Sequence, residues 1–236
     1  MKILLITRNL HKLQEFQYMM KGLPWVSITS LKELENGLKI PAKSISIIED
    51  GKSFIENATA KNGSFLHWYF AASTPVQEAF GQMQFTHLLA DDSGLEVDAL
   101  GGAPGICSAR YAAKEGSNEN ATDADNNAKL LHELRKTNNP NWSAHFRCVL
   151  ALTPLDVSQD GSELLAQTEI LEGICEGKIQ SAATGSTGFG YDPLFVPNDY
   201  QLSFAELGEK IKNKISHRAK AGQALLAYLT QVSTAV

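Results

Sequence analysis

The sequence predicts an α/β protein, because strand-like and helix-like patterns alternate along its 236 residues. Near the start, Lys2 to Ile6 is typical of a strand, and Leu13, Phe16 and Met20 then recur at helical spacing. A second apolar run, Leu88 to Ala90, predicts a buried strand near the middle of the chain. The length suits one large domain or two lobes that share a core.

A polar turn, Thr7 to Lys12, joins the first strand to the first helix, with Asn9 as a candidate N-cap. A strand, a turn and a helix N-terminus together form an anion site, because free N–H groups and the helix dipole point at the ligand. Lys12 lies in the first helical turn, where a cation opposes the dipole. Either Lys12 contacts a bound anion, or it is a tolerated surface lysine.

Between this helix and the central strand, the pattern predicts one further strand and one long helix. We expect the strand at Trp25 to Thr29 and the helix from Ser53 to about Ala72. Residues 76–85 are expected to form an irregular insertion before the central strand. Glu49, just ahead of the helix, has no role that helix capping explains.

The central stretch holds two adjacent acids, Asp91 and Asp92. We expect the strand of Leu88 to Ala90 to end there, with a turn at Ser93-Gly94 before a second alternating strand. Neighbouring side chains of a strand point to opposite faces, so the two acids are expected to face different ways. Buried acids are costly unless they are paired, hydrogen-bonded or bound to a metal. The alternative is a strand end with solvated turn acids.

The second half of the chain continues the alternation. A glycine-rich stretch, Thr184 to Pro193, contains Phe189 and Tyr191, which offer either flat surfaces for a base or two core side chains. Other expected elements are a helix at Asp123 to Lys136, a strand at Ala144 to Leu150, a hairpin at Asp160-Gly161 before a strand at Leu164 to Ile174, a helix after Ser203 that carries Lys210, Lys212 and Lys214, and a last helix after Ser216-His217-Arg218.

Composition narrows the class of partner. The formal net charge is -5, which gives no support for a nucleic-acid polymer as the partner. We expect no membrane association, because no segment approaches membrane-spanning length and Met1 to Ile6 is too short for an export signal. Cys107, Cys148 and Cys175 lack metal-site or redox spacing, so reduced thiols and a cytoplasmic location are expected.

Six segments in this order resemble one known family over nearly the whole chain. They are Thr7-x-Asn9-x-x-Lys12, Ser53-Phe54-x-Glu56-Asn57-Ala58, Ala90-Asp91-Asp92-Ser93-Gly94-Leu95-x-Val97, Gly101-Gly102-x-Pro104-Gly105 with Ser108-Ala109-Arg110-Tyr111, Phe189-Gly190-Tyr191-Asp192-Pro193 and Ser216-His217-Arg218. Each segment alone is weak, but together they look like the noncanonical purine nucleoside triphosphate pyrophosphatases, the inosine/xanthosine triphosphatase family.

The resemblance implies a mixed, elongated central sheet flanked by helices, with two lobes and the active site in the cleft between them. It implies a single domain over 1–236, with a probable insertion at 74–85. It also implies a homodimer and a Mg²⁺-dependent reaction. The substrates would be ITP, dITP or XTP, cleaved to the monophosphate and pyrophosphate, which keeps these nucleotides out of DNA and RNA.

The resemblance also assigns roles to residues. Asp92 matches the proton acceptor and a metal ligand, and Glu49 matches a second metal ligand. The residues that match substrate contacts are Thr7, Arg8, Asn9, Leu10, His11, Lys12, Ser93, Phe189, Gly190, Tyr191, Asp192, Lys212, His217 and Arg218.

The chain departs from the family pattern at two positions. Ile48 stands where a first acid often precedes Glu49, and Ile211 stands where a glutamate usually precedes the lysine equivalent to Lys212. Two other functions stay open: a pyrophosphatase for other modified or ordinary nucleoside triphosphates, and a nucleotide-binding sensor that has lost its chemistry. The acids at Asp91-Asp92 and the cation Lys12 disfavour the sensor.

Overall fold

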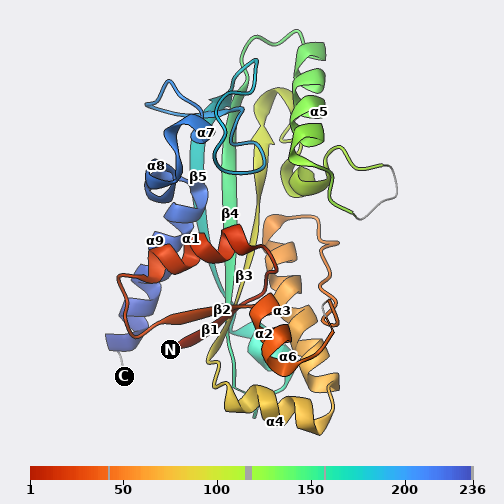
Figure 1. The fold of residues 1–236 in the computed structure, drawn as a ribbon, viewed down its shortest axis with the longest axis vertical. Coiled ribbons are helices and arrows are strands. Elements are labelled where there is room, and N and C mark those ends of the chain that lie inside the picture. Colours follow the sequence, from red (N-terminus) through yellow and green to blue (C-terminus); the bar gives the residue numbers. More distant parts are fainter. Residues whose placement is uncertain (42, 115–118, 157, 235–236) are drawn as a thin grey trace. The chain divides into compact units, whose positions relative to one another are not determined.

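A computed structural model describes residues 1–41, 43–114, 119–156 and 158–234 of the chain (Figure 1). The chain divides into two compact units. Unit 1 comprises Met1–Asp92, Val149–Glu172 and Ala221–Val236, and unit 2 comprises Ser93–Cys148 and Gly173–Lys220.

A six-stranded sheet has the strand order β2-β1-β3-β4-β5-β6. In it β1 pairs in parallel with β2 and β3, whereas β5 and β6 are antiparallel, so the sheet is mixed. The strands are β1 (Lys2–Leu5), β2 (Ser27–Ser30), β3 (His87–Val97), β4 (Ser143–Pro154), β5 (Glu169–Ile179) and β6 (Phe195–Pro197). With the helices around it, this sheet confirms the predicted α/β class.

In unit 1, helices follow the strands closely, and α1 packs beside β2. Helix α1 begins at Leu10 because Asn9 caps it, its side chain accepting from the N–H groups of His11 and Lys12. Helix α1 comprises Leu10–Met20. The other helices with residues in this unit are α2 (Leu31–Leu38), α3 (Phe54–Ala71), α4 (Thr74–Gln82), α6 (Gly161–Ala166) and most of α9 (His217–Thr234).

In unit 2, α5 (Asp123–Lys136) packs on two short 3₁₀ turns, Asp98–Leu100 and Gly105–Arg110. Two further helices, α7 (Phe204–Leu207) and α8 (Glu209–Ile215), are separated by Gly208 at φ +75°. The single helix expected after Ser203 is therefore two helices, because only a residue without a Cβ adopts this conformation cheaply.

Each unit has an apolar core. In unit 1, residues Ile3 to Leu5 of β1 are fully buried, and Phe65 of α3 packs against Phe80 of α4 with ring centroids 5.5 Å apart. In unit 2, Leu95, Phe146, Cys175 and Phe195 belong to one buried cluster that draws on four strands. None of the helices in the described ranges has the length and apolarity needed to cross a membrane.

The turn expected at Ser93-Gly94 is wrong, because β3 runs without a break from His87 to Val97 through both acids. The strand continues because the acids have buried partners, described below, and so need no solvent-exposed turn. Asp91 and Asp92 are only 2% and 7% exposed.

Two other local expectations are also wrong. Most of the segment expected to be irregular at 76–85 is helix α4, which starts with Pro75 in its first turn, a position where proline is favoured. The hairpin expected at Asp160-Gly161 is the start of α6, where the Asp160 side chain caps the helix and Glu163 reciprocates. Asp-Gly thus acts as a helix start here instead of a hairpin turn.

Candidate functional site

The adjacent acids of β3 face opposite ways, as their alternation predicts. Asp91 forms an ion pair with Lys12, which projects from the first turn of α1. Asp92 Oδ1 accepts a hydrogen bond from Lys61 Nζ of α3 at 2.8 Å, and its Oδ2 accepts from Asn57 Nδ2 at 3.2 Å. Each buried carboxylate therefore has its own lysine, which offsets the cost of burying a charge.

The pair with Asp91 gives the unfavourable position of Lys12 in the α1 dipole a structural reason. The lysine is anchored below the polar turn, in which Thr7 Oγ1 accepts from Asn9 N at 3.2 Å. Leu10 and His11 are exposed, so the turn ends in a helix start that faces solvent. Because the Asn9 side chain already accepts from two N–H groups of this turn, what the turn offers an anion is the positive end of the helix dipole and the Lys12 cation.

The Lys61 ammonium group contacts three acceptor groups. Besides Asp92, its ammonium group donates to the backbone carbonyl of Asp91 at 2.9 Å and lies 3.3 Å from Glu49 Oε2. The Lys61 side chain is 6% exposed, whereas that of Glu49 is 44% exposed. We call Lys12, Glu49, Lys61, Asp91 and Asp92 the acid–lysine cluster; all five belong to unit 1.

Burial and charge act in opposite directions on this cluster. Burial raises the pKa of Asp92 above its usual range, and the nearby Lys61 ammonium only partly offsets that rise. For Lys61, burial favours the neutral form, but attraction to Asp92 and Glu49 prevails and raises its pKa. Lys61 therefore stays charged, and Asp92 is a better proton acceptor than an ordinary aspartate.

Arg8 was predicted to contact substrate, yet its guanidinium is engaged within unit 1. It donates to both carboxylate oxygens of buried Glu35, at 3.0 and 2.5 Å, and to the carbonyl of Ile45 at 2.7 Å. These bonds tie the polar turn to α2 and to the segment that leads to Glu49. No local motif of the sequence marks Glu35 as the partner of Arg8.

A second cluster lies in unit 2 around Asp192, which is 1% exposed. One carboxylate oxygen of Asp192 accepts from Lys212 Nζ at 2.6 Å and from the backbone N–H of Phe189 at 2.9 Å. The Lys212 ammonium lies 4.2 Å from the centroid of the Phe189 ring, and the Arg218 guanidinium carbon lies 5.9 Å from it. We call Phe189, Asp192, Lys212 and Arg218 the aromatic–cation cluster.

Arg218 and His217 begin α9 and are both buried. Arg218 Nη2 donates to Ser93 Oγ at 2.8 Å, while the His217 ring stacks on Phe146 with centroids 4.7 Å apart. The structure thus brings Ser93, Arg218 and the Phe189 segment together. His217 packs on the core of the same unit.

Tyr191 and Gly190 have different environments. The Tyr191 hydroxyl donates to the carbonyl of Ser108 at 2.9 Å, and burial of this side chain raises its pKa. Of the two readings for the aromatic pair, Tyr191 therefore fits a core side chain. Gly190 is at φ +62°, where its N–H donates to Asp123 Oδ2 at 2.7 Å.

Sequence reasoning missed Lys61 and gave no role to Asn57, although a signal was present. Both lie on the buried side of α3 with Ala58 and Phe65. They are four residues apart, so they share one face of the helix. A lysine on the buried side of a helix requires a paired charge, which would have pointed to the acids of β3.

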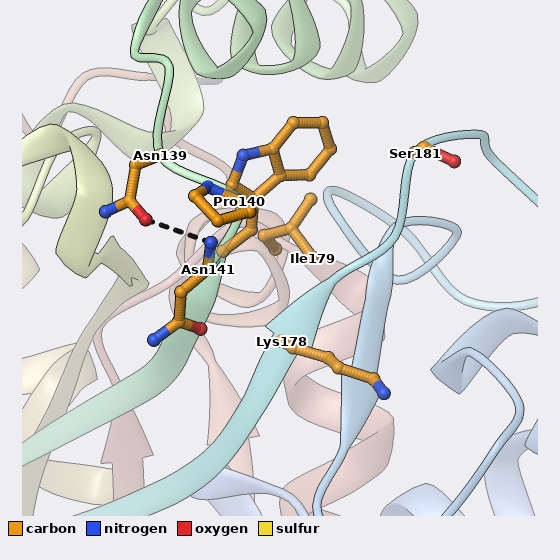
Figure 2. A pocket seen from close by; sticks show the side chains of 7 residues that line it. Asn139, Pro140, Asn141, Lys178, Ile179 and Ser181 are labelled. Atoms are coloured by element: carbon orange, nitrogen blue, oxygen red, sulfur yellow. Dashed lines mark hydrogen bonds between the residues drawn. The ribbon is translucent and has the colours of Figure 1, made fainter.

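A cavity of about 380 Å³ in unit 2 contains none of the predicted site residues. Figure 2 shows its lining, where the Asn139 amide oxygen accepts from the N–H of Asn141 at 2.9 Å. Two polar groups of the lining are thus hydrogen-bonded to each other within the loop before β4. The residues lining it are Asn139, Pro140, Asn141, Trp142, Lys178, Ile179 and Ser181.

Comparison with known proteins gives concordant results. Residues 3–228 match the model of the Ham1 family. A protein of Protochlamydia amoebophila named dITP/XTP pyrophosphatase is 41% identical over 230 residues, which is 97% of this chain and 98% of that protein. A protein of the same name from Clostridium perfringens is 38% identical over 95% of both chains.

Solved structures agree with the sequence comparisons. The structure of a HAM1 protein from Coxiella burnetii matches with a TM-score of 0.74 and 33% identity, covering 98% of this chain and 99% of that one. The Ham1 protein of Staphylococcus aureus matches with a TM-score of 0.70 and 30% identity, over 98% and 99% of the two chains.

Proposed function

Because this chain belongs to the Ham1 family, we propose that it is a nucleoside triphosphate pyrophosphatase acting on noncanonical purine nucleotides. The substrates are dITP, XTP and ITP, and the products are the nucleoside monophosphate and pyrophosphate. Removing these nucleotides prevents their incorporation into DNA and RNA.

The observation that carries the proposal is the acid–lysine cluster, in which each of two buried adjacent acids is held by a different lysine. In the reaction, a water oxygen bonds to the α-phosphorus, and the bond from that phosphorus to the bridging oxygen breaks. The water proton passes to Asp92, and the bonding electrons leave with pyrophosphate. The raised pKa of Asp92 suits it to receive this proton.

Two features of unit 1 bind the triphosphate in this proposal. The turn Thr7 to Lys12 presents the N-terminus of α1, and Lys12 and Lys61 supply positive charge. Triphosphate hydrolysis is accelerated mainly by such electrostatic stabilisation. We assign Arg8 to holding this turn in place through Glu35, not to direct contact with the substrate.

Glu49 and Asp92 are suited to hold Mg²⁺, because both carboxylates converge on one cation, the Lys61 ammonium. No group of three or more His, Cys, Asp or Glu side chains with metal-binding geometry occurs in the described ranges. Mg²⁺ commonly takes one or two carboxylates and fills its other positions with water and phosphate oxygens. When bound, it would neutralise phosphate charge and polarise the attacking water.

We assign the base to the aromatic–cation cluster of unit 2. Phe189 offers a ring for stacking, and Arg218 and Lys212 offer donors beside it. Hypoxanthine and xanthine carry a carbonyl where adenine carries an amino group, so donors favour the first two. One lost buried hydrogen bond costs about 1–3 kcal/mol, which is roughly a 5- to 150-fold discrimination.

A panel of triphosphates with Mg²⁺, followed by pyrophosphate release, tests this function. We expect dITP, XTP and ITP to be hydrolysed far faster than ATP or pyrimidine triphosphates. Asp92→Asn is the matched control and should lower turnover by at least ~10²-fold while the protein stays folded. Preference for a pyrimidine triphosphate, or no hydrolysis at all, would support one of the two other functions instead.

We further propose that the protein is a cytoplasmic homodimer. Three free cysteines accord with a reducing compartment. Light scattering after gel filtration should give twice the chain mass of 25.7 kDa. A mass of one chain would contradict the dimer and leave the proposed reaction unaffected.

A further inference from the structure

The N-terminal part of α5 is hydrogen-bonded to the loop that carries Phe189. Asp123 Oδ2 accepts from the N–H of Gly190 at 2.7 Å, and Asn127 Nδ2 donates to the carbonyl of Gly190 at 3.0 Å. Asp123 and Asn127 are four residues apart, so they project from the same face of the helix. Both backbone polar groups of one residue are therefore held by one helix.

Gly190 is a point where backbone conformation must be fixed. Its φ of +62° lies in the left-handed region, and no neighbouring atom would contact a Cβ placed there. Glycine populates other regions freely, so this conformation needs a restraint. The two hydrogen bonds from α5 hold both backbone polar groups of Gly190 in it.

The same part of α5 also holds the segment made of the second 3₁₀ turn, Gly105–Arg110, and the residues just after it. Buried Asn126 donates to the carbonyl of Ala109 at 3.1 Å and accepts from the N–H of Ala112 at 2.8 Å. The hydroxyl of Tyr191 donates to the carbonyl of Ser108 in that segment. These hydrogen bonds connect the Phe189 loop, this segment and α5 to one another.

We propose that Asp123 and Asn127 are positioning residues for base recognition. They fix Gly190 and thereby set the orientation of the preceding Phe189 ring beside Lys212 and Arg218. Neither residue touches the base in this scheme. The inference rests on the proposed function for its catalytic readout, but its structural part can be measured without any substrate.

The chain supplies a matched control in Asp125. Asp123 and Asp125 are both acids in the first turn of α5, and both are exposed. The Asp125 side chain accepts from the hydroxyl of Thr122 at 2.7 Å, and within the described part of the chain it makes no hydrogen bond to the Phe189 loop. Asp123→Ala and Asp125→Ala therefore remove the same charge from the helix terminus, but only the first removes a hydrogen bond to Gly190.

Amide hydrogen exchange in the nucleotide-free protein is the deciding measurement. We expect faster exchange over residues 188–191 in Asp123→Ala, unchanged exchange there in Asp125→Ala, and near-normal exchange in Asp123→Asn, whose amide oxygen still accepts. Equal exchange in the two alanine variants would overturn the proposal. If Asp123→Ala does not fold, Asn127→Ala removes the other bond and is read by the same criterion.

Kinetics then test the link to base recognition. Asp123→Ala should raise KM for ITP by roughly three- to tenfold with little change in kcat, while Asp125→Ala leaves both within about twofold. An unchanged KM in a variant with faster exchange would show that the loop does not position the base. A wild-type protein that hydrolyses no triphosphate would refute the proposed function, and hydrogen exchange would still decide whether α5 positions the loop.

Discussion

Lys61 is the residue that makes two adjacent buried acids compatible with one strand. Its ammonium group donates to the Asp92 carboxylate and to the Asp91 carbonyl, and it lies beside Glu49. Lys12 forms an ion pair with the Asp91 carboxylate from the other face of β3. A buried charge without a partner is strongly destabilising, so the ion pairs of this cluster stabilise the fold. In the same arrangement, burial raises the pKa of Asp92, which suits the proton-accepting role that we propose for it.

The first prediction concerns the titration of Asp92. Because burial favours the neutral acid, its carboxyl should titrate in metal-free protein at a midpoint above the ~3.9 of free aspartate. The acid is then ionised only above this raised midpoint, and proton acceptance is lost as the pH falls through it. Carbon-13 NMR of labelled aspartate carboxyls measures this directly.

Two perturbations check the cause of that shift. Lys61→Gln removes the cation that lowers the Asp92 pKa, so the midpoint should move further up. Mg²⁺ should move it down in the wild-type protein, because a bound cation favours the carboxylate. A midpoint that does not respond to Mg²⁺ would remove Asp92 from the proposed metal site.

A second prediction separates a structural role of Arg8 from a substrate contact. Arg8→Ala leaves Glu35 buried without its cation and should lower the free energy of unfolding by about 3 kcal/mol. In the double variant Arg8→Ala with Glu35→Leu, denaturant unfolding should show much of that stability restored. If hydrolysis of ITP recovers with it, Arg8 acts through Glu35. Full stability with persistently raised KM would instead assign Arg8 to the substrate.

At the level of elements, the loop before β6 contains Gly188 and Gly190, which share a positive φ but differ in their surroundings. Gly188 is at φ +80°, and a Cβ there would lie 2.1 Å from Asp192 Oδ2. Gly190 has a similar φ of +62° but open space around it. The two positions therefore separate the effect of backbone strain from that of steric conflict within one loop.

A third prediction uses this pair. Gly190→Ala should cost only the left-handed strain of one residue, about 1–2 kcal/mol. Gly188→Ala should cost more, because it also forces Asp192 away from Lys212 and from the Phe189 N–H. Thermal unfolding of both variants measures the difference. Equal losses of stability would show that Asp192 is not fixed in the position described.

For the molecule as a whole, local patterns predicted most helices and strands, but not how the central stretch is built. Asp91-Asp92-Ser93-Gly94 has the composition of a turn, but it is part of a strand between β1 and β4, and Lys12 and Lys61, distant in sequence, pair with its two acids. Asp160-Gly161 was misread as a hairpin because the same residues also cap helices, and Glu163 decides between the two.

The site was predicted in the same uneven way. Motifs pointed to Asp92, Lys12 and the Phe189 segment as candidates, because their residue types suit the proposed chemistry. They did not identify Lys61, Glu35 or Asp123, whose roles depend on which side chain lies opposite in the folded chain. Such pairs join residues tens of positions apart, and no local pattern specifies them.

The most direct test of the central claim is the identity of the products formed from ITP in ¹⁸O-labelled water. Attack by water on the α-phosphorus, assisted by Asp92, predicts IMP and pyrophosphate as the primary products, with the label in IMP. Phosphorus NMR and mass spectrometry distinguish these species. Formation of IDP and labelled orthophosphate as the primary products would contradict the account.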